Sequence, residues 1–330
     1  MTEAILIDDR ANAKGFYDFL TGHAAALPQI RVLEKEDAMA DPGFCAQVRF
    51  LFSCWNMPLL SDDDLARLFP RLEAVFYAAG DPSYFAGPFT RRSIPIFTAK
   101  DENAIPVAEF VLAQILLANK GYFLAEREYR RGFWKFAFRS ARRLSQSMAG
   151  NYRSTVGIVG FGAIGSLVAK LLQPFDMHVL VHDPFVSDED IKQAGARAVG
   201  LQELFAVCDV ITNHLPDTER TSTLLTYPLF SSMKPHATFI NTGRGRQVDE
   251  KALVRAMREE PSRLALLDVT RHEPPRPMSA IFRTNNILIS PHIAGSQAAE
   301  IERLYEAVYN AYLTFRPPPT TNVSVPGEQV

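Results

Sequence analysis

Short apolar runs and longer amphipathic stretches alternate along most of this chain. In residues 1–100 the apolar runs have the length of β-strands, and amphipathic stretches such as residues 62–69 separate them. Alternation of strand and helix is typical of a parallel sheet with helices on both faces, so this part predicts a small α/β domain. The expected strands are residues 4–7, 30–33, 48–54, 74–78 and 94–98.

The same alternation resumes after Ser154 and predicts a second α/β unit. The expected strands are residues 155–159, 178–182, 210–213, 238–241, 264–269 and 287–290. The expected helices are residues 164–172, 188–194, 201–207, 227–233 and 250–259. Six parallel strands with crossover helices have the size of a full dinucleotide-binding domain. A last helix is expected at residues 297–315, and the Pro- and Thr-rich tail from Arg316 is expected to be extended.

The segment between the two units has a different character. Residues 107–118 predict a helix with Pro106 in its first turn. Residues 120–143 then hold eight Lys or Arg, two Glu and seven aromatic residues. Basic residues mixed with aromatic ones can bind single-stranded nucleic acid. Because the rest of the chain is not basic, we favour a helical arm that packs on another subunit.

Length and composition exclude several classes of protein. A chain of 330 residues is long for one domain, and 47% hydrophobic with 22% charged residues is typical of a globular protein. The net charge of −2 favours neither nucleic acid nor a membrane surface as the partner. The acidic start lacks the basic region of a signal peptide. Three cysteines without metal-type spacing predict reduced thiols, no bound metal and a cytoplasmic location.

A glycine-rich turn, Gly160-Phe-Gly-Ala-Ile-Gly165, follows the strand at residues 155–159 and precedes a helix. In this context Gly160 allows the sharp turn, Gly162 lets the backbone approach a pyrophosphate, and Gly165 lets the helix pack on the strand. The next strand ends in Asp183, 18 residues after Gly165. A carboxylate there accepts the ribose hydroxyls and repels a 2′-phosphate. The turn therefore predicts a nucleotide site for NAD rather than NADP.

The ends of the later strands carry polar side chains, and ligands of such sheets bind at those ends. Arg244 lies between two glycines in Asn241-Thr-Gly-Arg-Gly245, and its fork can pair with a carboxylate. His292 lies in Ser290-Pro-His-Ile-Ala-Gly295 and can exchange a proton near neutral pH. Glu273 could accept the other ring N–H of His292. A nucleotide site with these three groups suggests an enzyme that moves a hydride and a proton together.

Taken together, these segments resemble the D-isomer-specific 2-hydroxyacid dehydrogenase family. The match is specific from about residue 156 to residue 295. The matching residues are Gly160 to Gly165, Asp183, His214 to Thr218 with Thr221, Met233 to Pro235, Asn241 to Gly245, Val248 to Glu250, Leu267 to Val269, Glu273 with Pro274, and Pro291 to Gly295.

The resemblance implies a role for each of these residues. Arg244 would bind and polarise the 2-keto acid, His292 would donate or remove the proton, and Glu273 would support His292. Asp268 would hydrogen-bond the nicotinamide carboxamide. The residues implied to bind NAD are Gly160, Gly162, Ala163, Ile164, Gly165, Asp183, His214, Pro216, Thr221, Thr242, Gly243, Asp268 and Gly295.

The resemblance also implies the architecture. A Rossmann NAD-binding domain, residues 101–295, would be inserted into a smaller flavodoxin-like substrate domain, residues 1–100 and 296–330, both doubly wound. The active site would lie in the cleft between them, and closure would exclude water. Family members are typically homodimers, which supports a dimerisation arm at residues 120–150, with Trp134 reaching toward the partner's substrate pocket.

The first hundred residues depart from the family pattern. Members carry a glycine-rich loop whose backbone holds the substrate carboxylate, and the corresponding residues here are Ala79 and Gly80, followed by Asp81. Asp81 would repel a carboxylate if it pointed inward. The usual asparagine-rich turn appears only as Asp101-Glu-Asn-Ala104.

The sequence thus predicts an NAD-dependent enzyme that interconverts a small D-2-hydroxy acid and its 2-keto acid. The alternative is a non-catalytic NAD(H)-sensing corepressor or scaffold on the same fold. A methyltransferase with a glycine-rich turn is disfavoured by the later motifs.

Overall fold

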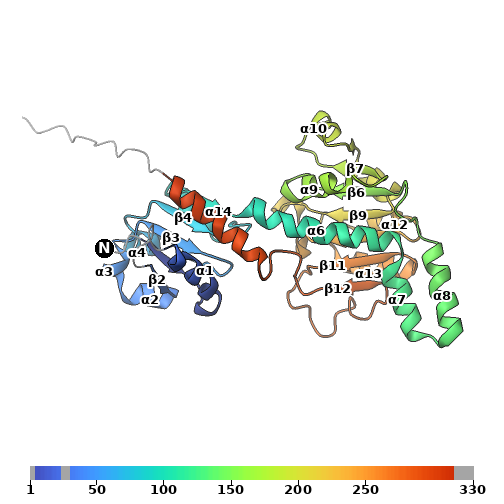
Figure 1. Cartoon of the computed structure of the whole chain (residues 1–330), viewed down its shortest axis with the longest axis horizontal. Helices are drawn as coiled ribbons and strands as arrows, with labels where there is room; N and C mark the ends of the chain where they lie inside the picture. Colours follow the sequence, from blue (N-terminus) through green and yellow to red (C-terminus); the bar gives the residue numbers. More distant parts are fainter. Residues whose placement is uncertain (1–3, 24–29, 316–330) are drawn as a thin grey trace, which may run out of the picture. The chain divides into compact units, whose positions relative to one another are not determined.

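The computed structural model describes residues 4–23 and 30–315, with the side chains of residues 10–12 left out (Figure 1). The tail from Arg316, expected to be extended, lies outside the described residues. The chain divides into two compact units, Met1–Glu102 with Ala298–Val330, and Asn103–Gln297. Each unit contains one parallel sheet, so the α/β class with two parallel sheets is confirmed.

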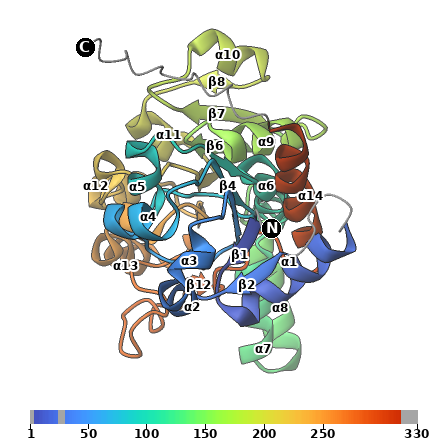
Figure 2. The ribbon, with the colours of Figure 1, turned by 90° about the vertical axis from the view of Figure 1, so that its left-hand side faces the viewer.

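The first unit has a five-stranded sheet in the order β2-β1-β3-β4-β5, which is the flavodoxin-like order. Its strands are β1 (Ala4–Ile7), β2 (Arg31–Leu33), β3 (Phe50–Ser53), β4 (Ala74–Tyr77) and β5 (Ile96–Thr98). Side chains alternate between two cores. Leu6 and Phe76 face helices α1 (Arg10–Gly22) and α14 (Glu300–Thr314), while Ile5 and Val75 face the opposite core. The helices on that second face are α2 (Lys35–Ala40), α3 (Pro42–Cys45), α4 (Asp62–Leu68) and α5 (Ala86–Arg91) (Figure 2).

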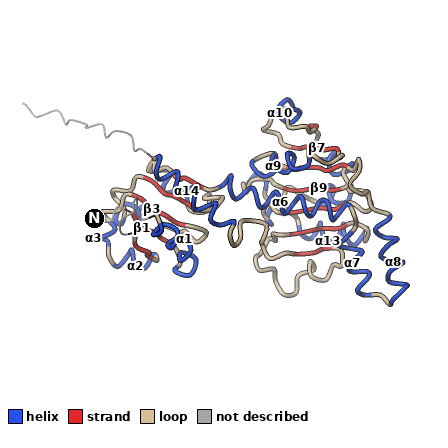
Figure 3. Tube along the Cα trace, in the orientation of Figure 1, coloured by secondary structure: helices blue, strands red, loops and turns tan. Residues whose placement is uncertain are grey.

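The second unit has a seven-stranded sheet in the order β12-β11-β10-β9-β6-β7-β8. Counted from β6, this is the Rossmann order 3-2-1-4-5-6 extended by one strand. The strands are β6 (Thr155–Val159), β7 (His178–His182), β8 (Arg197–Ala198), β9 (Val210–Asn213), β10 (Thr238–Asn241), β11 (Leu264–Leu267) and β12 (Ile287–Ile289) (Figure 3). The sequence predicted six strands. It missed β8, which is only two residues long and has no apolar run.

Helices cover both faces of this sheet, so its strands are buried on both sides. One core contains residues of α11 (Leu201–Val207), α12 (Tyr227–Ser232) and α13 (Glu250–Glu259). The other contains residues of α6 (Lys100–Asn119), α9 (Ala163–Leu172) and α10 (Asp188–Gln193). Burial on both faces explains why these strands read as nearly continuous apolar runs.

Two local expectations were wrong. Helix α6 begins at Lys100, so Pro106 lies inside the helix rather than in its first turn, and residues 101–104 are helical rather than a turn. A proline inside a helix removes one backbone hydrogen bond. Here the buried side of α6, which includes Ala104, Pro106 and Val107, compensates through packing. The last helix is also shorter than expected and begins at Glu300.

The basic aromatic segment forms a hairpin of two helices, α7 (Tyr122–Arg131) and α8 (Trp134–Gln146). Gly132 separates them, and a Cβ there would lie 2.7 Å from the Ala137 Cβ.

In the described part of the chain, no single helix is long and apolar enough to cross a membrane. Helices α6 and α7 meet that test only as a pair bent by 60°.

Candidate active site

Six strands of the second unit end in register with one another. Their last residues, His182, Val159, Asn213, Asn241, Leu267 and Ile289, are successive pairing partners across the sheet. The residues that follow therefore emerge at one edge, which is where ligands bind in such sheets. Those residues are Asp183, Gly160, His214, Thr242, Asp268 and Ser290.

The glycine turn after β6 leaves room for a ligand at the start of α9. Gly160 has φ +90°, and a Cβ there would lie 2.8 Å from the backbone carbonyl of His214, so only glycine fits. Gly162 caps α9 without a side-chain hydrogen bond, and a Cβ there would meet no protein atom within 4 Å. Protein packing thus does not require this glycine. The open space beside Gly162 lies at the N-terminus of α9, which starts at Ala163 and Ile164, and helix N-termini of this kind can bind a pyrophosphate.

Asp183 follows β7, and the backbone orients its carboxylate. Oδ2 accepts a hydrogen bond from Phe161 N at 2.7 Å, and Oδ1 accepts one from Phe185 N at 2.9 Å. Each oxygen of a carboxylate has two lone-pair sites, so each can still accept from a ribose hydroxyl. The geometry therefore suits recognition of an unphosphorylated adenosine ribose.

His214 is buried and serves as a neutral structural group at the end of β9. Its Nε2 lies 2.9 Å from Thr212 Oγ1, and its Nδ1 lies 3.3 Å from Thr242 Oγ1. Burial lowers its pKa to about 3, so the ring carries no charge near neutral pH. With both ring nitrogens engaged inside the protein, His214 is not the proton carrier. The following loop is closed by Thr221 Oγ1, which donates to Pro216 O at 2.7 Å.

Arg244 is half-buried in the loop after β10. Its Nη1 donates to Gly243 O at 2.9 Å, and its backbone N–H donates to Gln247 Oε1 at 3.0 Å. A Cβ on Gly245 would lie 2.0 Å from the backbone carbonyl of Thr270. Gly245 therefore has a packing role, since it lets this loop touch the loop after β11.

Glu273 and His292 lie in contact, which the sequence could not establish. Glu273 Oε2 is 2.7 Å from His292 Nδ1, and Glu273 Oε1 accepts from Thr270 N at 3.1 Å. Their side chains are 40% and 52% exposed, so the pair is open to solvent. A carboxylate at Nδ1 fixes the orientation of the ring. Proton transfer to a ligand then falls to Nε2.

Asp268 holds the turn that carries His292. Its Oδ1 accepts from Ser290 Oγ at 2.5 Å and Ile293 N at 2.9 Å, and its Oδ2 accepts from Ala294 N at 2.9 Å. Its backbone oxygen accepts from His292 N at 3.0 Å. His292 has φ +54°, a strained conformation that costs about 1–3 kcal/mol and must be held by its surroundings. Asp268 therefore orients the histidine, a function that its implied role at the nicotinamide did not include.

The remaining predicted residues lie in two places. Gly295 packs against Asn103, whose Oδ1 accepts from Ser296 N at 3.1 Å. Ala79 and Gly80 belong to the first unit and follow β4, and Ala79 O accepts from Ala99 N at 3.1 Å. Asp81 is exposed, and its Oδ1 accepts from Ser83 N at 2.9 Å in a local turn.

Three amide side chains are buried beneath this edge, and no role was predicted for any of them from the sequence: Asn213, Asn241 and Gln247. The available signal was an asparagine as the last residue of two adjacent apolar strands, Val210-Ile-Thr-Asn213 and Thr238-Phe-Ile-Asn241. A polar residue there is satisfied only by partners across the sheet, which the sequence did not identify.

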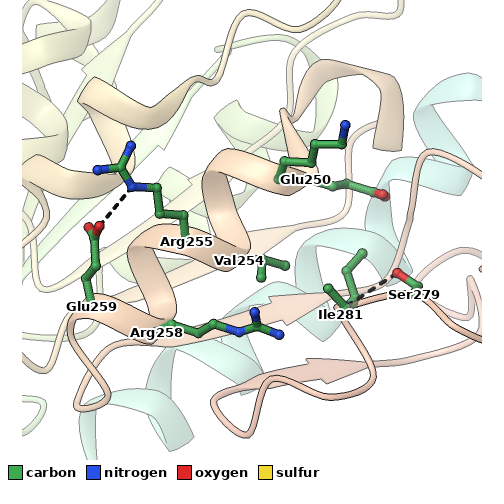
Figure 4. Close-up of a pocket in the computed structure, with 9 residues that line it drawn as sticks. Glu250, Val254, Arg255, Arg258, Glu259, Ser279 and Ile281 are labelled. Carbon is green, nitrogen blue, oxygen red and sulfur yellow. Dashed lines mark hydrogen bonds and ion pairs between the residues drawn. The ribbon is translucent and has the colours of Figure 1, made fainter.

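A separate hollow of about 580 Å³ runs along α13 (Figure 4). Its walls carry charges of both signs, and Arg255 Nε pairs with Glu259 Oε1 at 2.8 Å. None of the strand-end residues lines it. The lining residues are Glu250, Lys251, Val254, Arg255, Arg258, Glu259, Ser279, Ala280 and Ile281.

Comparison with known proteins gives a family for this arrangement. Residues 112–294 match the NAD binding domain of D-isomer specific 2-hydroxyacid dehydrogenases. A glyoxylate reductase of Korarchaeum cryptofilum is 31% identical over 275 residues, covering 81% of this chain and 82% of that protein. A D-3-phosphoglycerate dehydrogenase of Archaeoglobus fulgidus is 35% identical over 207 residues, covering 63% of this chain but only 38% of that protein.

Solved structures share the fold over nearly the whole chain. A D-lactate dehydrogenase of Aquifex aeolicus, complexed with NAD and lactic acid, has a TM-score of 0.68 at 24% identity and covers 94% of this chain and 95% of its own. The D-mandelate dehydrogenase of Rhodotorula graminis has a TM-score of 0.75 at 19% identity, with 93% of each chain covered. This chain belongs to the D-isomer specific 2-hydroxyacid dehydrogenase family, and its second unit carries the NAD binding domain of that family.

Proposed function

We propose that the protein is an NAD-dependent oxidoreductase that interconverts a small D-2-hydroxy acid and its 2-keto acid. The observation that carries this proposal is the Glu273–His292 pair, with 2.7 Å between Oε2 and Nδ1, at the same edge of the sheet as Arg244 and the Gly160 turn. A histidine held by a carboxylate is suited to proton exchange. A corepressor that only senses NAD(H) has no need of such a pair, so the pair favours an enzyme over a corepressor.

The residues divide the work of the reaction. NAD, when bound, supplies the hydride acceptor, and NADH the hydride donor. The N-terminus of α9 and Asp183 hold the dinucleotide by its pyrophosphate and ribose. Arg244 pairs with the carboxylate of the acid and polarises the carbonyl. His292 gives a proton to the carbonyl oxygen during reduction and removes it during oxidation, while Glu273 stabilises the charged ring.

The first unit is proposed as the substrate domain, with the backbone N–H of Gly80 at the carboxylate. The sequence also predicted Ala79 there, but the Ala79 N–H donates to Tyr77 O at 2.8 Å. Asp81 would repel a substrate carboxylate if it pointed inward. One oxygen of the Asp81 carboxylate accepts from Ser83 N in a local turn, which supports the assignment of this unit to the substrate.

Three buried free cysteines support a cytoplasmic location. Burial raises the pKa of Cys45 to about 11 and that of Cys208 to about 12, so these thiols are unreactive structural groups.

The activity is tested with NADH and a panel of 2-keto acids of different size and charge, including phosphorylated ones. We expect loss of NADH absorbance with at least one acid. Tight NADH binding without turnover of any acid would instead support the corepressor and sink the proposal.

Cofactor choice is expected to depend on the charge of Asp183. The parent should bind NADPH about a hundredfold more weakly than NADH, because a 2′-phosphate would meet a like charge. Asp183→Asn removes the charge but keeps an oxygen that can accept from Phe161 N. The ratio of the NADPH and NADH dissociation constants should therefore fall by about tenfold. Fluorescence titration with NADH and NADPH measures this ratio. Equal affinities in the parent would contradict the role of Asp183.

A homodimer is proposed through the α7–α8 hairpin. Phe133, Trp134 and Phe136 are 80%, 68% and 75% exposed there, an apolar patch that supports a protein interface. Sedimentation should show a dimer for the parent and a shift toward monomer for Phe133→Ser with Phe136→Ser. Leu313→Ser, a change at an exposed apolar residue on α14, is the control. A monomeric parent would rule out this interface.

A further inference from the structure

Gln247 is fully buried, and its side-chain amide makes four hydrogen bonds. Oε1 accepts from Arg244 N at 3.0 Å and from Asn213 Nδ2 at 2.7 Å. Nε2 donates to Leu215 O and to Pro216 O, both at 2.9 Å. The amide thus uses both lone pairs and both hydrogens.

These bonds join two loops that are far apart in the chain. Leu215 and Pro216 belong to the loop after β9, on the cofactor side, and Arg244 belongs to the loop after β10. Asn213 Nδ2 also donates to Asn241 Oδ1 at 2.9 Å, and Asn241 Oδ1 accepts from Gly243 N at 3.1 Å. The network therefore holds the backbone N–H groups of Gly243 and Arg244, on the N-terminal side of the Arg244 side chain.

The network also explains Gly243. A Cβ at this position would lie 2.7 Å from Gln247 Oε1 and 2.8 Å from Asn213 Nδ2. A larger residue would push the two amides apart. The glycine before Arg244 is therefore required by the amides beneath it.

We propose that Gln247 is a positioning residue that sets the backbone of Arg244 relative to the cofactor-side loop at Leu215 and Pro216. This inference rests on the proposed function, in which Arg244 binds the acid. Gln247 is fully buried, so it acts through the groups that it bonds, Arg244 N and the carbonyls of Leu215 and Pro216. Its acceptor oxygen fixes the direction of the Arg244 N–H, and its two donors fix the distance between the loops.

Three variants test whether Gln247 positions Arg244 or only stabilises the folded protein. Gln247→Leu leaves Arg244 N and Asn213 Nδ2 without their buried acceptor, so the melting temperature should fall and KM for the 2-keto acid should rise about tenfold. KM for NADH should change by a factor of about two. The double variant Asn213→Leu with Gln247→Leu removes the Asn213 N–H that Gln247→Leu leaves unpaired, but Asn241 Oδ1 and Leu215 N also lose their Asn213 partners. Its melting temperature should therefore stay low, and its KM for the acid should stay raised.

Asn286→Leu is the matched control. Asn286 is buried and donates to Met257 O and Arg263 O, both at 2.8 Å, just before β12 and so at the opposite end of the strands. This variant should lose stability and keep the parent KM. A parent-like KM for the acid in Gln247→Leu and in the double variant would overturn the proposal.

Hydrogen exchange at the backbone amide of Arg244 tests the role of Gln247 without a measurement of activity. Exchange should be slow in the parent and faster in Gln247→Leu and the double variant, and unchanged in Asn286→Leu. If the parent reduces no acid, the proposed function fails, and parent-like exchange in Gln247→Leu would separately overturn the role of Gln247.

Discussion

Replacement of His292 by alanine is expected to lower kcat for 2-keto acid reduction by about a thousandfold, the usual size of a lost general acid. The reason is that the carbonyl oxygen must receive a proton as the carbonyl carbon receives the hydride. His292 is open to solvent and bonds Glu273 through Nδ1, whereas His214 is buried with both ring nitrogens engaged. Steady-state kinetics measures the loss, and NADH titration should show binding within a factor of about two of the parent.

Glu273→Gln tests the support that Glu273 gives to His292, and we expect a smaller loss of activity than in His292→Ala. Glutamine can still bond to Nδ1 but carries no charge to stabilise the protonated ring, so kcat should fall by about tenfold to a hundredfold, less than in His292→Ala. The melting temperature should change little in both variants, because the two side chains are partly exposed. Parent-like turnover in His292→Ala would remove this residue from the mechanism.

Arg244→Gln is expected to raise KM for the 2-keto acid by about a hundredfold, because a charge-assisted pair with the substrate carboxylate is lost. Arg244→Lys keeps the charge without the planar fork, so it should recover only part of the affinity. The same kinetic measurement with saturating NADH tests both variants.

Arg246 offers a matched control two residues away. It pairs with Asp217 and, through Nη1, with Glu219 Oε1 at 3.2 Å on the surface of the loop. Surface pairs of this kind contribute little, so Arg246→Gln should leave KM for the acid unchanged. An equal rise in KM for Arg244→Gln and Arg246→Gln would indicate a general loss of positive charge rather than a specific anchor.

The second unit was predictable from its hydrophobic pattern to an unusual degree. Strands β6, β7, β9 and β10 match the expected residues at both ends. Each is a short run buried on both faces, and a glycine, aspartate, histidine or threonine follows at once. Such a boundary can be read from the sequence because a glycine or a polar residue follows the run directly.

Predictions failed where local sequence leaves a choice. Pro106 is acceptable in the first turn of a helix, so a helix start near it was reasonable, but packing carries α6 back to Lys100. Strand β8 consists of Arg197 and Ala198, and only its pairing with β7 makes it a strand. In both cases the deciding interactions come from residues distant in the chain.

The sequence by itself determined the order of strands and helices, the nucleotide turn, and which chemical groups follow each strand. Only the tertiary structure decided which of those groups meet. It placed Glu273 at Nδ1 of His292, bound the Asp268 carboxylate to the turn at residues 290–294, and buried Gln247 between Arg244 and the loop after β9. The physical reason is that hydrophobic periodicity is a local property of the chain. Hydrogen-bond partners are instead selected by strand register and loop packing, which bring together residues tens of positions apart.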